Sequence, residues 1–121
     1  MKFSSAVLSI EVSGHIATLW LDRPEKRNAM SNEMVADLPR AMAAIAEIPD
    51  LRAVIIAGRG KSFCVGIDLA SLGGFNAGEG GGENVSGATA NVRQMQVTRA
   101  FQASISSVAN CPVPVIAAIH S

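Results

Sequence analysis

The residues best suited to chemistry lie around a glycine bend in the middle of the chain. Residues 54–57 form a β-branched apolar run, which predicts a buried strand, and Gly58 and Gly60 predict a turn after it. Gly66 then permits a sharp bend, and Asp68 two residues later indicates the start of a helix. Main-chain N–H groups at such a bend point outward. The stretch therefore predicts a site for a developing oxyanion or for a phosphate.

The same stretch has two plainer interpretations. Gly60-Lys61-Ser62 resembles the end of a nucleotide-binding P-loop, but that motif requires Gly at position 55, where this chain has Ile. Alternatively, the stretch is only strand, turn and strand, and hydrophobic periodicity by itself favours that interpretation. The choice depends on the segments that flank the stretch.

Composition argues against several classes of function. The chain has 121 residues with ten basic and ten acidic side chains, so its net charge is zero. The scattered Lys and Arg residues form no basic patch for nucleic acid. The longest apolar run, Val113–Ile119, is far too short to span a bilayer. We therefore expect one domain at most, with no nucleic-acid partner and no membrane span.

The N-terminus and the cysteines favour a cytoplasmic protein. Ser9 and Glu11 interrupt the first apolar stretch, which makes it a poor signal peptide. Cys64 and Cys111 both lie in apolar contexts. A disulfide between them is an alternative, but two reduced core residues are favoured in a chain without a secretory signal. The His and Cys residues show no metal-ligand spacing, so we expect no metal site.

Hydrophobic spacing predicts the elements that position the glycine bend. Val7–Val12 and His15–Leu21 predict two strands joined by a Ser13-Gly14 turn. Ser31 predicts the N-cap of a helix, and Pro39 lies inside that helix, where proline costs about 3 kcal/mol and no role for it is apparent. The predicted apolar face of the helix consists of Met34 or Val35, Leu38, Met42 and Ile45.

The last third of the chain begins with a Gly-rich segment. Residues 73–88 cannot form a packed core from such a composition, so we expect a flexible loop. Ala90–Val108 returns to helical spacing, and Val115–Ile119 predicts a buried strand. This order of strands and helices suits an α/β fold. The helix face that we expect in the core consists of Val97, Phe101, Ile105 and Val108.

Three segments carry a resemblance to a known family. They are LDRPEKRNAMS at Leu21–Ser31, AGRGKSFCVGIDL at Ala57–Leu69 and CPVPVIAAIHS at Cys111–Ser121. Their order and approximate spacing resemble those of the crotonase family, which is also called the enoyl-CoA hydratase/isomerase superfamily. The resemblance covers nearly the whole chain. It implies an α/β fold of the crotonase-like (ClpP/crotonase) type, a spiral of repeated ββα units, with residues 1–121 as the N-terminal portion of a single domain.

The resemblance also implies a site for a CoA thioester. The backbone N–H of Ile67 would be the first donor of an oxyanion hole for the thioester carbonyl. The loop with Lys26 and Arg27 would lie against the adenosine and phosphates of CoA, since both cations suit such anions, although a charged, solvated loop is the plainer alternative. CoA is part of the substrate, so no separate cofactor is expected. The implied substrate-binding residues are Lys26, Arg27, Ala29, Val65, Gly66, Ile67, Asp68 and Leu69.

The family's remaining catalytic groups come from beyond the equivalent of Ser121. They include the second oxyanion donor and the acidic residues that move protons. Among the residues present, Asp68 is a poor candidate base, since a carboxylate near a helix start is usually a cap. Cys64 is a poor candidate nucleophile, because a free Cys without a partner base is usually a small core residue.

The resemblance leaves three functions open. The first is an enoyl-CoA hydratase, which adds water across the 2,3 double bond in fatty-acid degradation, as a homotrimer or dimer of trimers. The second is an enoyl- or dienoyl-CoA isomerase, because Gly66–Leu69 and the pattern of Arg93, Phe101 and Cys111-Pro112 resemble the dienoyl-CoA isomerase branch. The third is a truncated, non-catalytic fragment that binds CoA. Acidic residues beyond Ser121 would discriminate between the two enzymes.

Overall fold

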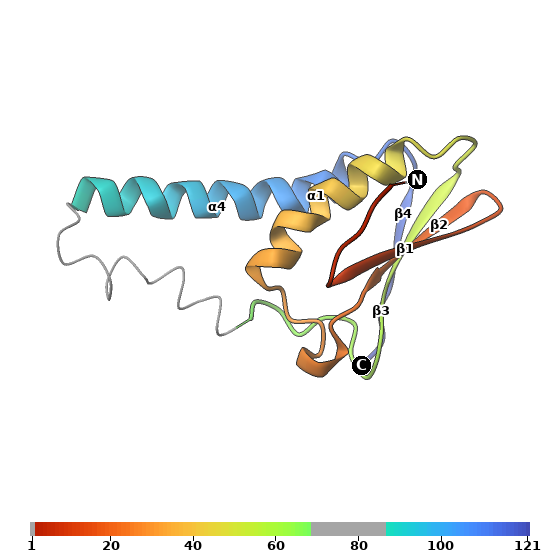
Figure 1. The fold of residues 1–121 in the computed structure, drawn as a ribbon, viewed down its shortest axis with the longest axis horizontal. Coiled ribbons are helices and arrows are strands. Elements are labelled where there is room, and N and C mark those ends of the chain that lie inside the picture. The colour runs from red at the N-terminus through yellow and green to blue at the C-terminus, as the bar shows by residue number, and fades with distance from the viewer. Residues whose placement is uncertain (1, 69–86) are drawn as a thin grey trace.

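The computed structural model describes residues 2–68 and 87–121 and contains a four-stranded sheet (Figure 1). The first two strands are antiparallel, whereas the second, third and fourth run parallel. The sheet and the helices beside it confirm the predicted α/β class. In spatial order, the strands are β1 (Leu8–Ser13), β2 (Ile16–Leu21), β3 (Ala53–Gly58) and β4 (Val115–Ala118).

The β1–β2 hairpin turns through Gly14 and His15. Gly14 has a φ of 59°, which the tight turn between two strands requires, and β1 ends at Ser13. The turn therefore lies one residue later than the predicted Ser13-Gly14. His15 also anchors the chain before β3, because its ring Nδ1 lies 2.9 Å from the Asp50 carbonyl and its own carbonyl accepts the Arg52 N–H at 2.7 Å.

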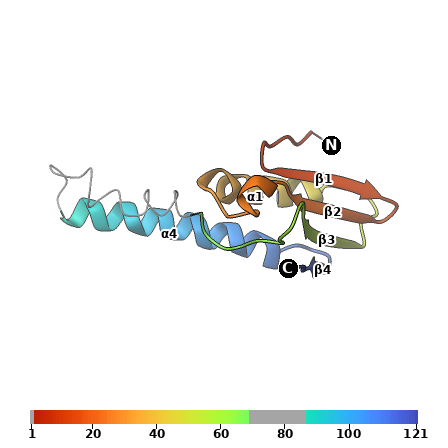
Figure 2. The same cartoon turned by 90° about the horizontal axis from the view of Figure 1, so that it is seen from below.

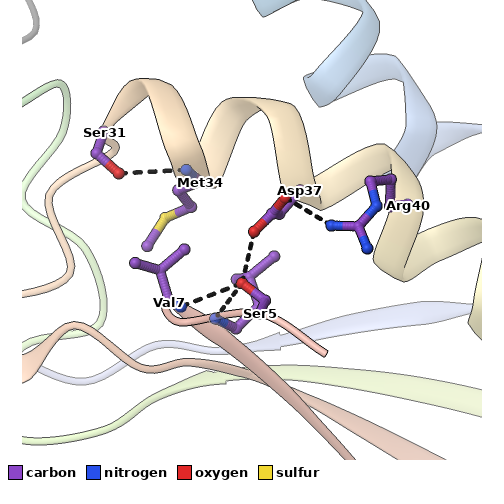
Figure 3. Close-up of polar contacts among 7 residues, drawn as sticks. Ser5, Val7, Ser31, Met34, Asp37 and Arg40 are labelled. Carbon is purple, nitrogen blue, oxygen red and sulfur yellow. Dashed lines mark hydrogen bonds and ion pairs between the residues drawn. The ribbon is translucent and has the colours of Figure 1, made fainter. Parts of the chain in front are cut away.

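Helix α1 (Asn32–Ala46) connects β2 to β3 and begins where the sequence predicts. The Ser31 hydroxyl accepts the Met34 N–H at 3.2 Å, which makes Ser31 the N-cap (Figure 3). Ser5, from the segment before β1, donates to the Asp37 carboxylate at 2.6 Å and holds that segment against the helix (Figure 3). The buried face confirms the prediction and selects Met34 over Val35; it comprises Met34, Leu38, Ala41, Met42 and Ile45.

Helix α4 (Gly87–Ala109) connects β3 to β4 and lies beside α1 on the same side of the sheet (Figures 1 and 2). Since it begins at Gly87, the last two residues of the predicted loop belong to the helix, and residues 73–86 lie outside the described part. Ser104 is buried, whereas Ile105 is 49% exposed, so its predicted place in the core is wrong. The helical period places position 104 closer than 105 to the half-buried face that Val97 and Phe101 share.

Strand β4 is mostly exposed in the described structure. Val115 is half-buried on the helix side, whereas Ile116 is 55% exposed on the other side. Ile116 pairs with Ile55 of β3 in register and so shares its face. The sequence predicts a fully buried strand here, because a continuous apolar run does not reveal which face is covered. Val115 is therefore the one partly buried residue of β4, and Ile116, Ala117 and Ala118 are exposed within the described structure.

Candidate functional site

The loop after β2 folds back through two consecutive residues in the left-handed conformation. Pro24–Lys26 form a short 3-10 helix, and Arg27 and Asn28 follow with φ values of 51° and 58°. Asn adopts this conformation more readily than most residues. The Asn28 N–H donates to the Arg23 carbonyl at 2.9 Å and closes the loop. As a result, the side chains of Lys26 and Arg27 are exposed, and that of Asn28 is buried.

The buried Asn28 side chain joins this loop to the turn after β3. Its Oδ1 accepts the Arg23 N–H at 2.8 Å, and its Nδ2 donates to the carbonyls of Arg59 at 2.9 Å and Ser62 at 2.8 Å. Gly58 makes room for it, since a Cβ there would lie 2.8 Å from Asn28 Nδ2. Asn28 is not among the site residues predicted from the sequence. The available signal was a polar residue, suited to the left-handed region, just before a helix N-cap.

Ile67 lies beside Met30 in an isolated parallel bridge, and the helix predicted to start just after it lies outside the described residues. The Met30 N–H donates to the Gly66 carbonyl at 2.7 Å, and the Asp68 N–H donates to the Met30 carbonyl at 3.0 Å. Since peptide groups alternate in direction along extended backbone, the N–H of Ile67 points away from Met30. Within the described ranges it has no hydrogen-bond acceptor. The glycine bend, where Gly66 has a φ of 102°, thus presents the Ile67 N–H as a main-chain donor.

An apolar cavity of about 440 Å³ lies between α1 and α4, next to this donor. Val35 and Pro39 line it from α1, and Val97 and Phe101 line it from α4. Ile67, which is 38% exposed, forms part of its wall. The volume lies in the range of small-molecule sites. Pro39, whose role the sequence does not indicate, therefore contributes its ring to the wall of a cavity.

Asp68 is held in place by Arg23. One guanidinium nitrogen, Nη1 of Arg23, lies 2.5 Å from Oδ2 of Asp68 and 3.0 Å from the Ala29 carbonyl oxygen. The two charged side chains are only 17% and 13% exposed. This pairing fits a structural role for Asp68 better than that of a base. Arg23 went unrecognised in the sequence because the two partners lie on separate segments with no shared periodicity.

The predicted substrate residues fall into three groups. Ala29 is buried, and both its N–H and its carbonyl are hydrogen-bonded, to Lys26 and Arg23 respectively. Leu69 lies outside the described residues. The third group is exposed or half-buried and comprises Lys26, Arg27, Val65, Gly66, Ile67 and Asp68.

No three His, Cys, Asp or Glu side chains in residues 2–68 and 87–121 gather as metal ligands.

A second charged cluster supports the turn from the opposite face of the sheet. The Arg59 guanidinium lies 3.9 Å from the centroid of the Trp20 ring, and its Nη2 lies 3.0 Å from Oε1 of Glu11. Trp20 and the Arg59 guanidinium together hold the pKa of Glu11 below its usual value. The ion pair with Arg59 is the contact that the geometry supports, because the Trp20 indole nitrogen has no hydrogen-bond partner among the described residues. The cluster fixes the residue whose carbonyl Asn28 binds on the other side.

Comparison with known proteins identifies the family. The profile described as Enoyl-CoA hydratase/isomerase matches residues 11–121. The chain belongs to this family. Among its family relatives, the peroxisomal Delta(3,5)-Delta(2,4)-dienoyl-CoA isomerase of Arabidopsis thaliana is 34% identical over 84% of this chain. A Mycobacterium tuberculosis protein named "Probable enoyl-CoA hydratase EchA14" is 35% identical over 92% of it. The chain spans 36% and 38% of the lengths of these two relatives.

Solved structures confirm the crotonase-like fold. An enoyl-CoA hydratase of Mycobacterium smegmatis superposes with a TM-score of 0.72 at 27% identity, covering 97% of this chain and 41% of that one. AtuE of Pseudomonas aeruginosa superposes with a TM-score of 0.76 at 25% identity, covering 95% of this chain and 40% of that one. The sheet, α1 and α4 are thus arranged as in the family.

Proposed function

We propose that the protein acts on acyl-CoA thioesters as an enoyl-CoA hydratase. The observation that carries the proposal is the Ile67 N–H, which has no acceptor within the described ranges and lies beside an apolar cavity. A thioester joins a polar carbonyl to an apolar acyl chain. The donor suits the carbonyl and the cavity suits the chain, so one ligand would satisfy both.

The proposed chemistry relies on charge that develops on the thioester oxygen. As water adds across the 2,3 double bond, the carbonyl gains enolate character, and a preorganised N–H stabilises that charge by about 3 kcal/mol. The family resemblance assigns the second donor and the proton-transferring carboxylate to segments after Ser121. In this proposal the described residues bind the thioester and polarise it.

The exposed cations of the loop are proposed to bind the phosphates of CoA. Replacing both Lys26 and Arg27 by Ala should weaken CoA binding about tenfold at low salt and less at high salt, because salt screens exposed charges. Titration calorimetry at two ionic strengths measures this. The matched control replaces two other exposed cations, Lys2 and Arg52, and removes the same charge. Equal dissociation constants for the wild type and the loop variant would exclude these cations from the site.

A dienoyl-CoA double-bond isomerase is the second candidate. It is favoured by the identity of 36% over 93% of this chain to the mitochondrial Delta(3,5)-Delta(2,4)-dienoyl-CoA isomerase of Rattus norvegicus. The loss of crotonyl-CoA absorbance measures its hydration. If the hydratase proposal is correct, the rate of this hydration should exceed the rate at which a 3,5-dienoyl-CoA is isomerised. Isomerisation without hydration would make the isomerase the favoured function and would reject the hydratase. A lack of both reactions, combined with binding of CoA, would support the non-catalytic binding fragment.

The assembly and the setting of the protein belong to the same proposal. We propose a homotrimer or a dimer of trimers in the cytoplasm, acting in fatty-acid degradation with CoA as part of the substrate and no further cofactor. In the part of the chain that the structure describes, no helix combines the length and apolarity needed to cross a membrane. Light scattering coupled to size-exclusion chromatography measures the oligomeric state, and a monomer would contradict the proposed assembly.

A further inference from the structure

We propose that Arg23 is a positioning residue that sets the direction of the Ile67 N–H by clamping Asp68. This inference rests on the proposed function, because it assigns a purpose to the orientation of that donor. Arg23 does not line the cavity, and in this proposal it acts through the backbone next to Ile67.

The clamp lies directly next to the donor in the chain. Ile67 is followed directly by Asp68, whose backbone N–H and side chain are both engaged, the former by the Met30 carbonyl at 3.0 Å and the latter by Arg23. The peptide group that carries the Ile67 N–H also contains the Gly66 carbonyl, which accepts the Met30 N–H at 2.7 Å. Two backbone bonds and one ion pair therefore fix the segment on both sides of the donor.

The segment needs a clamp because its own backbone restrains it weakly. Gly66 has a φ of 102°, in the region that glycine enters easily, so the bend is intrinsically permissive. The bridge between Met30 and Ile67 is isolated from the described sheet and so lacks neighbouring ladder bonds. A partly buried, charge-assisted contact is a strong restraint at such a place.

Arg23 is itself held in place by neighbouring groups. Its guanidinium also donates to the Ala29 carbonyl at 3.0 Å, and its backbone N–H donates to Asn28 Oδ1 at 2.8 Å. Asn28 in turn binds the carbonyls of Arg59 and Ser62. The turn after β3, the loop after β2 and the segment at Asp68 are thus connected by continuous polar contacts, and the donor takes its direction from the sheet.

The first arm of the test measures hydrogen exchange without any ligand. In R23Q and D68A, the protection factor of the backbone amide at position 68 should fall about tenfold, and R23K should restore part of it. The control is D37A, because Asp37 is also 13% exposed and also pairs with an arginine, Arg40, at 2.8 Å. Unchanged protection at position 68 in R23Q and D68A would overturn the proposal whatever the protein binds.

The second arm measures polarisation of the bound carbonyl. With butyryl-CoA labelled with ¹³C at its carbonyl, the wild type and D37A should shift the carbon resonance downfield on binding, and R23Q should lose most of the shift. The dissociation constant of R23Q should change less than threefold, since Lys26 and Arg27 remain and the backbone N–H at position 23 still bonds to Asn28. A full shift in R23Q would overturn the positioning role. Absence of a shift in the wild type would overturn the proposed function and with it the purpose of the clamp. The hydrogen-exchange experiment would still show whether Arg23 restrains the backbone at position 68.

Discussion

Asn28 is the residue on which the geometry of the site depends most. Its side chain makes three hydrogen bonds to main-chain groups while fully buried. Replacement by Ala would leave one N–H and two carbonyls without this partner, and each loss costs about 1–3 kcal/mol. We expect N28A to lower the free energy of unfolding by about 3 kcal/mol. Urea denaturation measures this loss.

A second substitution at the same position separates polarity from size. N28D keeps the acceptor for the Arg23 N–H but places an oxygen against the carbonyls of Arg59 and Ser62. It should therefore destabilise the protein at least as much as N28A at neutral pH. N110A, at an exposed Asn, is the control and should change stability by less than about 0.5 kcal/mol. A stable N28D would show that the amide donor contributes little.

The residues that sequence reasoning could find are those whose signals are local. Gly66 indicates a bend by its own type, and the resemblance to the family singled out the neighbouring Ile67 as the donor. Arg23 and Asn28 carry no such signal, because their partners come from Asp68 and from the turn after β3. Contacts of this kind exist only after the sheet has brought the segments together.

Among the elements, α1 contains a proline that should lower the stability of the protein while it shapes the cavity wall. Pro39 cannot donate to the carbonyl of Val35, and both residues line the cavity. P39A should raise the free energy of unfolding by about 2 kcal/mol, since about 3 kcal/mol of helix penalty is partly offset by a freer unfolded chain. Its affinity for acyl-CoA should fall, because the ring leaves the cavity wall. Chemical denaturation and ligand titration measure the two effects.

The opposite signs of these effects make P39A informative. A control at Ala43, an exposed position of the same helix that is absent from the cavity lining, uses A43S and should alter neither property by much. If P39A lowered stability, the packing of the ring would outweigh the missing hydrogen bond. If affinity were unchanged, the cavity would not receive the acyl chain.

The β1–β2 pair carries a pH-dependent contribution through Glu11. Trp20 and Arg59 lower its folded-state pKa, so its stabilisation is present above the unfolded value of about 4.3 and is lost as the pH falls through the folded value. The melting temperature of the wild type should exceed that of E11Q at pH 7, and the difference should shrink as the pH falls through the folded-state pKa of Glu11. E25Q, at another exposed glutamate, controls for the loss of one negative charge. A difference that does not shrink on acidification would contradict the assignment.

Element types followed from the sequence more closely than their environments did. Periodicity and the Ser31 cap correctly predicted α1 and its buried face. The same reasoning failed at Ile105 and Ile116, which are exposed. An apolar residue signals an element's type through its spacing, but burial also depends on which neighbours cover that element, and spacing does not contain this information.

At the scale of the whole molecule, one face of the sheet exposes apolar side chains. Ile16 and Ile116 are 42% and 55% exposed on the side away from the helices. Such a surface should bind the dye ANS, and I116K should reduce the ANS fluorescence by about half because it places a charge on this apolar face. The control A43K places a lysine on the exposed side of α1. Equal fluorescence for the wild type and I116K would place the dye elsewhere.

The order of the strands in space equals their order along the chain. A ribosome releases the chain from its N-terminus, so the hairpin of β1 and β2 is complete before the later strands emerge. Each following strand, delivered by its own helix, finds the edge it needs already exposed (Figure 1). The sheet can therefore grow by addition at one edge during synthesis, without waiting for a distant partner. The contacts of Asn28 then form as β3 arrives, so the support for the Ile67 donor is assembled early in the life of the protein.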